Sequence, residues 1–486
     1  MEVQLETVPN KKTKIEIPNF DDKESQFKFR QATTNTNEFT DCFKSEGNLM
    51  KQCDVWLSKL KAHIKTSFKK IRIRPVKIRP SAADPLIKQR NSLLKHGEFE
   101  KSQIIDAQIA KIISKEGRIK ANMFRKFCNP NRSHVLSEMW QLKKKLFPRK
   151  TPALPSAKYN YQGKIVTEPN ELTKLMGKEY GTLRLRKRPC HPLNNEIRPI
   201  RNKLLKLKLF IAKQKKTDQF LMTDLEVVLK GLKTKKARGP DGLSRTLFRN
   251  SIIGTNLKDP LLQMFNKIKD AGKLPNFMKK ATVITIPKKG SNLKLQNERG
   301  IFLVNTVRSI LMRLVFNLKY SMFESNMSDS NIGGRRKKSG INHIWVMNNV
   351  IHDQLSCVKK VPIVIQKFDY KQMFDGMDNE EACGDMFNYG VNDDHLTMIH
   401  EANSKIVICV KTPQGVSEPY TLINKTMQGD TWAPAMASAQ VDSFGKEMLE
   451  NQPSFMFKFN GEVPIPLLGQ VDDLLGVAEA GLKVSN

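Results

Sequence analysis

Two adjacent aspartates interrupt an apolar run in the stretch GQVDDLLGV, from Gly469 to Val477. The segments IPLLGQV and LLGVA on either side have the composition of the two strands of a hairpin, with Asp472 and Asp473 at its turn. An aspartate in a surface turn needs no functional explanation. Here, however, the flanking strands look buried, and neighbouring carboxylates repel each other unless a cation neutralises them. The pair therefore predicts a hard divalent metal held by oxygen ligands.

A third carboxylate, Asp369, ends the β-branched segment VPIVIQKFD. If this segment is a strand beside the hairpin, Asp369 and Asp472 can bridge two metal ions, which lie about 3.5–4 Å apart in two-metal phosphoryl-transfer sites. Asp375 and Asp378 follow in MFDGMD, and we interpret them as helix caps or surface charges rather than as ligands.

The segments around these aspartates predict an α+β fold. KIVICVKTP (405–413) has the pattern of a strand, and DTWAPAMASAQVDSFGKEML (430–449) has that of a helix with Pro434 near its start. The order strand, strand, helix, hairpin is typical of an antiparallel sheet with helices on one face.

The segment before these elements also contains clear periodic patterns. A short helix is expected in MTDLEVVLKGLKTKK (222–236), with Thr223 and Glu226 in the spacing of a capping box. KKATVITIPKKG (279–290) alternates like a strand, and VNTVRSILMRLVFNLKYSMF (304–323) has the pattern of a helix.

The charge of the chain indicates a polyanionic partner. Its 83 Lys and Arg residues outnumber 48 Asp and Glu, which gives a net charge of +35. Such a field attracts nucleic acid because binding releases condensed counterions. The alternative is a surface charged for solubility, which needs a net charge of only roughly 2 to 8 on a small domain.

The first 220 residues carry two basic clusters, at 68–80 and 183–208, and a predicted amphipathic helix at 101–127. The clusters suit a phosphate backbone and a solvated face equally well. The 7 cysteines of the chain include no CxxC pair, so reduced, buried or incidental thiols are expected. No apolar run approaches the ~20 residues of a spanning helix, and the start lacks the order of a signal peptide. These features predict an intracellular protein that is soluble or bound to nucleic acid.

Three segments in order, FDYKQMFD, MQGDTWAPAMASAQVDSF and GQVDDLLGV, resemble the central palm motifs of reverse transcriptases of non-LTR (LINE-like) retrotransposons. Four segments upstream resemble the finger motifs of these enzymes: KKARGPDGLSRTLF, LPNFMKKATVITIPKKG, NERGIFLVNTVRSILMRLV and NIGGRRKKSGINHIWVMNNVI. The resemblance covers about residues 220 to 480. It implies the fingers and palm of a right-hand polymerase and an RNA-directed DNA polymerase activity that uses Mg²⁺, with Mn²⁺ as an alternative.

By this resemblance, Asp369 and Asp472 are the catalytic, metal-binding aspartates and Asp473 is the supporting carboxylate, while the backbone carbonyl of Tyr370 adds an oxygen ligand. Phe374 occupies the place of a bulky side chain that excludes a ribose 2′-hydroxyl. On the residues alone, a core phenylalanine is an equal alternative.

The resemblance also assigns residues to the nucleotide and the template. Gln428 and Gly429 match a pair that lies against the incoming nucleotide, and glycine permits close approach of the backbone. Arg299 matches an arginine that grips the triphosphate, with Lys288 or Lys289 assisting. Arg335 and Arg336 are expected to face the template strand.

The sequence departs from the family pattern at Gln470-Val471, where an aromatic-alanine pair is usual, and at Gly300, where a proline is usual. The chain is expected to comprise a basic, mainly helical, partly disordered region (1–220), fingers (221–360) and an incomplete palm (361–486) without a thumb. The partners implied are an RNA template, a DNA primer, dNTPs and components of a retroelement ribonucleoprotein in nucleus and cytoplasm, without a membrane. A binding protein without catalysis and an unrelated two-metal nuclease are the competing functions.

Overall fold

The computed structural model describes most of the chain from Glu16 onward. The described residues are 16–44, 46–72, 84–95, 98, 101, 103–108, 111, 159–161, 164–166, 168–180, 193–233, 237–249, 251–287, 298–356, 363–370, 373–412, 415–422, 425–451, 456–459, 463–465, 467–471 and 473–479. They form an α+β structure with one mixed and one antiparallel sheet of more than two strands.

The chain divides into two compact units. One consists of Met1–Lys12, Glu16–Ile71 and Pro155–Asn486, and the other of Thr13–Ile15 and Arg72–Leu154. The second unit contains α4 (Asp84–Lys95), where Arg90 forms an ion pair of 3.2 Å with Asp106. Within the helix predicted at 101–127, residues 103–108 are helical, and most of the remainder lies outside the described residues.

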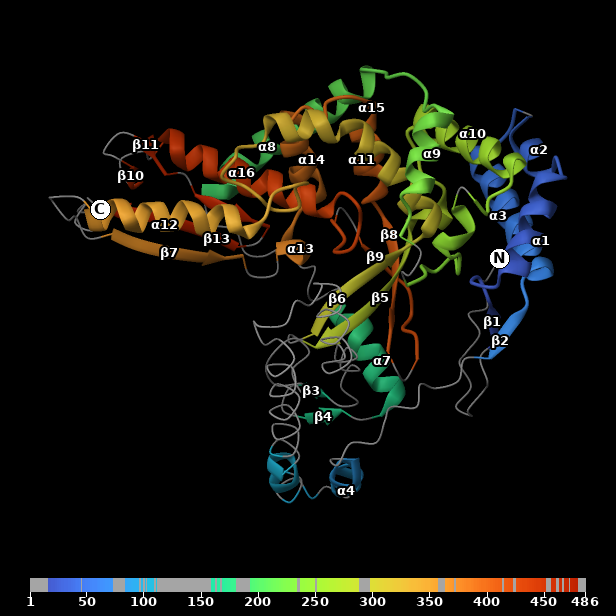
Figure 1. Cartoon of the computed structure of the whole chain (residues 1–486), viewed down its shortest axis with the longest axis horizontal. Coiled ribbons are helices and arrows are strands. Elements are labelled where there is room, and N and C mark those ends of the chain that lie inside the picture. Colours follow the sequence, from blue (N-terminus) through green and yellow to red (C-terminus); the bar gives the residue numbers. More distant parts are fainter. Residues whose placement is uncertain are drawn as a thin grey trace, which may run out of the picture. The chain divides into compact units, whose positions relative to one another are not determined.

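The first unit contains runs of successive helices separated by strands (Figure 1). The helices are α1 (Lys23–Thr34), α2 (Glu38–Lys44), α3 (Leu49–Ser67), α7 (Pro169–Lys178), α8 (Leu193–Gln214), α9 (Met222–Lys230), η2 (Arg245–Phe248), α10 (Thr255–Ala271), η3 (Asn276–Lys279), α11 (Thr306–Asn326), α12 (Gly340–Ser356), α13 (Met373–Gly376), α14 (Asn379–Asn388), α15 (Asp394–Ala402) and α16 (Ala433–Asn451). The strands of the chain are β1 (Glu16–Pro18), β2 (Lys70–Arg72), β3 (Tyr159–Tyr161), β4 (Lys164–Val166), β5 (Lys280–Pro287), β6 (Glu298–Val304), β7 (Ile363–Asp369), β8 (Ile406–Lys411), β9 (Tyr420–Leu422), β10 (Lys458–Phe459), β11 (Val463–Pro464), β12 (Leu468–Gln470) and β13 (Asp473–Glu479).

The first three helices pack on α10 and share its hydrophobic core. Phe29 of α1, Trp56 of α3 and Phe265 of α10 are fully buried members of one cluster. Asp22 and Asn48 cap α1 and α3 by accepting hydrogen bonds from backbone amides of the first turn. These helices therefore fold together with the later part of the chain and are not a separate tail.

Helix α9 confirms the predicted helix, but the predicted capping box is wrong. The helix begins at Met222, and the backbone N–H of Leu221 donates to Asp224 Oδ2 at 3.2 Å. Thr223 and Glu226 thus lie inside the helix. The carboxylate that satisfies the free N–H comes from Asp224, which stands at the third helical position.

The four-stranded sheet has the strand order β6-β5-β8-β9. Strand β5 runs antiparallel to β6 and parallel to β8, so the sheet is mixed. Val283 of β5 and Ile408 of β8 are fully buried, and α7 packs on this sheet through Leu172 and Met176. The strands predicted at 279–290 and 405–413 are confirmed, but the expectation that 405–413 joins one antiparallel sheet with the strand ending at Asp369 and the hairpin is wrong, because β8 pairs with β5 and β9 in this mixed sheet.

The three-stranded sheet has the order β12-β13-β7 and is antiparallel throughout. The predicted hairpin and the predicted strand ending at Asp369 are both confirmed. On one face, Leu474 of β13 joins the large core that includes Val441 of α16. On the other face, Val477 of β13 packs with Val350 of α12. Figure 1 shows α12 and α16 running beside this sheet.

One expectation about this sheet is wrong, and the exposure of one of its strands was not predicted. Helices cover both of its faces rather than one, because side chains of successive residues in β13 point to opposite faces and both sets include large apolar residues. Strand β7 is also not buried: Val364, Ile365 and Phe368 are 50%, 46% and 41% exposed. Strand β7 is an edge strand of the three-stranded sheet, so it lacks a neighbour on one side. Among the helices that the structure describes, none combines the length and apolar character needed to cross a bilayer.

Candidate active site

Asp369 and Asp473 lie directly opposite each other in the three-stranded sheet. Strand β7 ends at Asp369, β13 begins at Asp473, and these two residues are antiparallel cross-strand partners. Such partners point to the same face, with Cβ atoms about 4.5–5.5 Å apart. Both side chains are exposed. Because like charges in this position destabilise a sheet, the pair favours a cation between them.

Lys367 already supplies one positive charge at this place. It lies two residues before Asp369 and therefore on the same face of β7, and its Nζ is 2.8 Å from Asp473 Oδ1. The two side chains are 65% and 51% exposed, so this ion pair contributes little stability. The sequence interpretation overlooked Lys367, although the alternation of a strand places it beside the aspartates.

The hairpin turn joins β12 to β13 through Val471 and Asp472. Val471 has a positive φ of 59°, which is rare for a β-branched residue. Such a conformation costs about 1–3 kcal/mol and persists only where surrounding contacts impose it. Asp472, the predicted catalytic aspartate, lies outside the described residues.

The segment 330–334 provides contacts that hold the turn. The N–H of Ile332 donates to the carbonyl of Gly469, and the N–H of Gly469 donates to the carbonyl of Ser330, both at 2.9 Å. A Cβ on Gly333 would lie 2.4 Å from the backbone nitrogen of Val471. Only a glycine at position 333 therefore lets this segment approach the turn.

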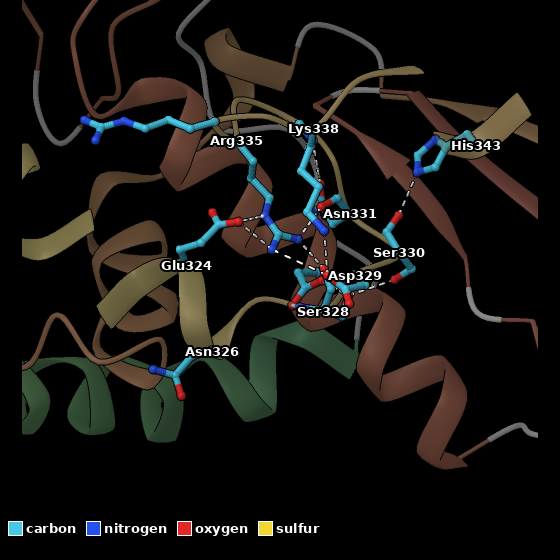
Figure 2. A network of polar contacts seen from close by, with 12 residues as sticks. Glu324, Asn326, Ser328, Asp329, Ser330, Asn331, Arg335, Lys338 and His343 are labelled. Carbon is cyan, nitrogen blue, oxygen red and sulfur yellow. Dashed lines mark hydrogen bonds and ion pairs between the residues drawn. The ribbon is translucent and has the colours of Figure 1, made fainter. Parts of the chain in front are cut away.

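A polar network around Arg335 also holds the same segment in place (Figure 2). The Arg335 guanidinium donates to the carbonyls of Ser328 and Asn331 and forms an ion pair with Glu324 at 2.8 Å. Its side chain is only 3% exposed. Because its donors point inward, we assign Arg335 a structural role in place of the template contact expected from the sequence.

Arg336 has a different environment. Its guanidinium carbon lies 4.3 Å from the ring centroid of Tyr320, and its Nη2 donates to Asn317 Oδ1 at 2.9 Å. The residue is exposed. Stacking on an aromatic face leaves further donors of the guanidinium toward solvent, so the predicted template contact remains a prediction.

Gln428 and Gly429 lie against β6. The N–H of Phe302 donates to the carbonyl of Gln428 at 3.0 Å. Gly429 has a φ of 114°, and a Cβ there would lie 2.7 Å from the carbonyl oxygen of Phe302. The neighbouring strand therefore accounts for this glycine without a ligand.

A fully buried ion pair follows immediately in the chain. Arg308 of α11 contacts the carboxylate of Asp430, and its Nη2 donates to Asn403 Oδ1 at 3.1 Å. Nε and Nη1 of Arg308 have no hydrogen-bond partner within the described part of the chain. This contact ties the Gln428-Gly429 segment to α11. Sequence reasoning missed it, although an arginine inside an apolar helix is a signal for a buried partner.

The remaining residues singled out from the sequence lie in different surroundings. Arg299 lies on β6 opposite Ile286 of β5, with an exposed side chain. Lys288 lies outside the described residues, as does Lys289. Phe374 is partly buried against the large core, which agrees with its interpretation as a core phenylalanine.

Burial raises the pKa of the Tyr370 hydroxyl, although the residue remains 38% exposed. Asp378 caps α14 by accepting from the N–H of Glu380 at 2.9 Å, which confirms its predicted role.

A second acidic group, Asp393, Asp394 and His395, has the composition of a metal site. Its carboxylates already have cationic partners: Lys319 contacts Asp393, and Lys269 lies 3.0 Å from Asp394. Burial raises the pKa of Asp393, but hydrogen bonds from His395 and Lys319 outweigh it and lower the pKa to about 2. These ion pairs join α15 to α10 and α11. We interpret the group as structural, because a metal would have to displace both lysines.

Compared with models of known protein families, the chain matches none.

Proposed function

We propose that this protein is an RNA-directed DNA polymerase, a reverse transcriptase of the non-LTR retrotransposon type. The observation that carries the proposal is the cross-strand placement of Asp369 and Asp473 at one end of a sheet, and Asp472 precedes Asp473 in the sequence. The motif order supports the same assignment. The finer fold proposed is the fingers (221–360) and palm (361–486) of a right-hand polymerase.

The donor set suits a hard divalent cation. Carboxylate oxygens are the ligands that Mg²⁺ prefers, and Asp369 and Asp473 present them on one exposed face. Asp369, Asp472, Asp473 and the carbonyl of Tyr370 would hold Mg²⁺ or Mn²⁺. When bound, the metal would lower the pKa of a primer 3′-hydroxyl and neutralise charge on the triphosphate. The surface position of the Lys367–Asp473 ion pair makes it easy to displace.

The residues of the chain would orient the reactants. The Arg299 guanidinium on β6 would bind the triphosphate, and Gln428 would lie against the nucleotide. Arg308, through Asp430, would hold the backbone that carries Gln428 in place. The RNA template and DNA primer would be attracted by the net charge of +35.

Primer extension tests this proposal. The full chain is incubated with poly(A), oligo(dT), dTTP and Mg²⁺, and Asp369→Asn and Asp472→Asn are compared with it. Each variant removes one anionic charge with little change of shape, so extension should fall by at least about 10²-fold, as expected when an essential electrostatic contact is lost. Lys411→Gln, at the end of β8, is the matched surface control and should extend normally. Equal extension by the wild-type and both aspartate variants would refute the proposal.

Nucleic-acid binding without catalysis is the second candidate, and the net charge of +35 favours it. It predicts salt-sensitive binding of RNA or DNA that is the same for Asp472→Asn, with no extension by any variant under any metal. Extension that depends on Asp369 and Asp472 would exclude it.

A further inference from the structure

Helix α8 carries an apolar stripe that faces away from the protein. Ile200, Leu204, Leu207 and Ile211 are 70%, 50%, 52% and 45% exposed. Their spacing of four, three and four residues is the a/d repeat of a coiled-coil seam. Phe210, beside this stripe, is 60% exposed. Large apolar side chains exposed together at this regularity mark an interaction surface.

The opposite face of α8 is already occupied. Leu205 and Ala212 are buried, and α8 packs against α14 and α15. Lys208 Nζ donates to Asn388 Oδ1 at 2.8 Å, which further fixes α8 on α14. The helix is therefore held with its stripe outward, and the stripe does not serve the packing of this unit.

The charges beside the stripe are all positive. In the heptad that places Leu204 at a and Leu207 at d, positions e and g hold Arg201 and Lys203 together with Phe210, while Lys208, also at e, is bound to Asn388 of α14. Arg201 lies 3.9 Å from Glu381, a long and exposed contact. Coiled-coil partners match these positions with the opposite charge. The seam therefore complements a helix with Glu or Asp at its e and g positions.

The charges of the seam disfavour one alternative occupant, and its aliphatic side chains and narrow shape disfavour two others. A second copy would oppose Lys203 and Arg201 with identical cations, and the whole chain carries +35. Phosphate groups do not need four aliphatic side chains. Helices that lie in a bilayer surface bury a broad apolar face, whereas this stripe is a narrow seam with its opposite side packed on protein.

We infer that α8 is a docking site for an amphipathic helix of another protein, with aliphatic residues at heptad spacing and acidic residues flanking them. The mode is that of a helix laid along apolar anchors at i, i+4 and i+7. This inference does not depend on the proposed polymerase activity, since none of the residues in the stripe belongs to the candidate active site.

Three labelled peptides of roughly 28 residues, long enough to be helical, test the inference by fluorescence anisotropy with the full chain. The first has Leu and Ile at a and d with Glu at e and g. The second keeps the Glu residues but has Ser at a and d, which controls for simple attraction to a basic protein. The third has the apolar seam with Lys at e and g. The first should bind at least about tenfold more tightly than the other two.

Variants of the chain complete the test. Leu204→Ser with Leu207→Ser should weaken binding of the first peptide by about tenfold or more, whereas Val227→Ser, exposed on α9, should leave it unchanged. Arg201→Glu with Lys203→Glu should transfer the preference to the Lys peptide. Circular dichroism checks that each variant is folded.

Three results would overturn the inference. The first is equal binding of the two Glu peptides. The second is binding of the chain to phosphatidylserine vesicles that needs Leu204 and Leu207 while no peptide binds, which would indicate a lipid surface. The third is a dimer in sedimentation velocity that depends on these leucines while no peptide binds.

Discussion

At the scale of single residues, buried charges constrain this protein more than its exposed ones. Arg308 and Asp430 lie in the core, where the cost of removing a charge from water is recovered only if the partner stays in place. Asp241 is buried with no cation in hydrogen-bond contact among the described residues, and its carboxylate accepts instead from the N–H groups of Thr306 and Leu243 at 2.7 and 3.3 Å. The Arg308–Asp430 pair and Asp241 each lead to a different prediction.

Arg308→Met should destabilise the protein by about 3–5 kcal/mol, because it leaves the carboxylate of Asp430 buried and unpaired. The free energy of unfolding is measured by urea titration at pH 7. Combining Arg308→Met with Asp430→Asn should recover part of the loss, since an amide costs less to bury than a charge. Arg336→Met, which removes an exposed guanidinium, is the control and should change stability by less than about 1 kcal/mol. Similar losses in the Arg308 and Arg336 variants would contradict the structural role of the buried pair.

Asp241 should make stability depend on pH. Burial raises its pKa to about 6, although hydrogen bonds from the backbone of Thr306 and Leu243 act in the opposite direction. The folded protein therefore holds this proton more tightly than the unfolded chain, where the pKa is near 4. The associated stability is complete below pH 4 and is lost as the pH rises through about 6, by roughly 2–3 kcal/mol.

Comparison with Asp241→Asn isolates this effect from the other carboxylates. On going from pH 4 to pH 7, the unfolding free energy of the wild type, measured by urea titration, should change by roughly 2–3 kcal/mol more in the destabilising direction than that of the variant, because the amide does not titrate. Parallel pH profiles of the two proteins would show that Asp241 does not carry the proton.

At the scale of elements, the positioning of the aspartate turn depends on a neighbour that is distant in the sequence. Ser330 and Ile332 hold Gly469 of β12 by two backbone hydrogen bonds, and the network around Arg335 holds the segment that contains them. The residues that form the candidate site are thus far in the sequence from the residues that position it.

Gly333→Ala should disturb the turn. The added methyl group would lie 2.4 Å from the backbone nitrogen of Val471 and 2.8 Å from Ser438 Oγ, so the backbone must move. We expect a loss of about 1–3 kcal/mol in unfolding free energy and a fall in primer extension larger than the unfolded fraction explains. Gly340→Ala is the matched control, because the nearest atom to its Cβ would be at 3.7 Å. If both variants keep wild-type extension and stability, Gly333 does not position the turn.

The periodicity and composition of the sequence predicted many of these elements. Strand β5 follows from the alternation of apolar residues, and helices α9 and α11 follow from their 3.6-residue period. Strands β7 and β8 and the hairpin follow from their β-branched or apolar composition, and α16 from its small residues with Pro434 near its start. Strand β6 was not predicted, because its apolar residues Ile301–Val304 are contiguous in the sequence, although their burial alternates in the structure.

Other features depend on contacts that one sequence does not reveal. The parallel pairing of β5 with β8 joins segments more than a hundred residues apart along the chain. The exposure of β7 follows neither from its β-branched composition nor from its place at the edge of the sheet alone, since β12, the other edge strand, has buried residues at Leu468 and Gly469. The inward direction of Arg335 depends on carbonyl groups of an irregular segment, which have no sequence signature.

At the scale of the whole molecule, the net charge of +35 should dominate encounters with nucleic acid. Lysines and arginines are spread over both the early helices and the later strands, so attraction does not require a single basic patch. The carboxylates of the candidate site are few among the 48 Asp and Glu residues and the 83 Lys and Arg residues of the chain. The affinity for nucleic acid should therefore respond to salt, whereas catalysis should respond to substitution of the aspartates of the candidate site.

Binding of a single-stranded RNA homopolymer should weaken steeply with salt. In a plot of the logarithm of the association constant against that of the salt concentration, we expect a slope more negative than about −3, since each neutralised phosphate contributes roughly −0.7 for single strands. The double variant Asp369→Asn/Asp473→Asn should keep the slope, because it removes no cation, and should bind as tightly as the wild type or more tightly. Fluorescence anisotropy at four or more salt concentrations measures both proteins. A slope near zero would mean that the excess charge is not used to bind polyanions, whereas a lower affinity of the double variant would mean that the aspartates themselves help to hold the strand.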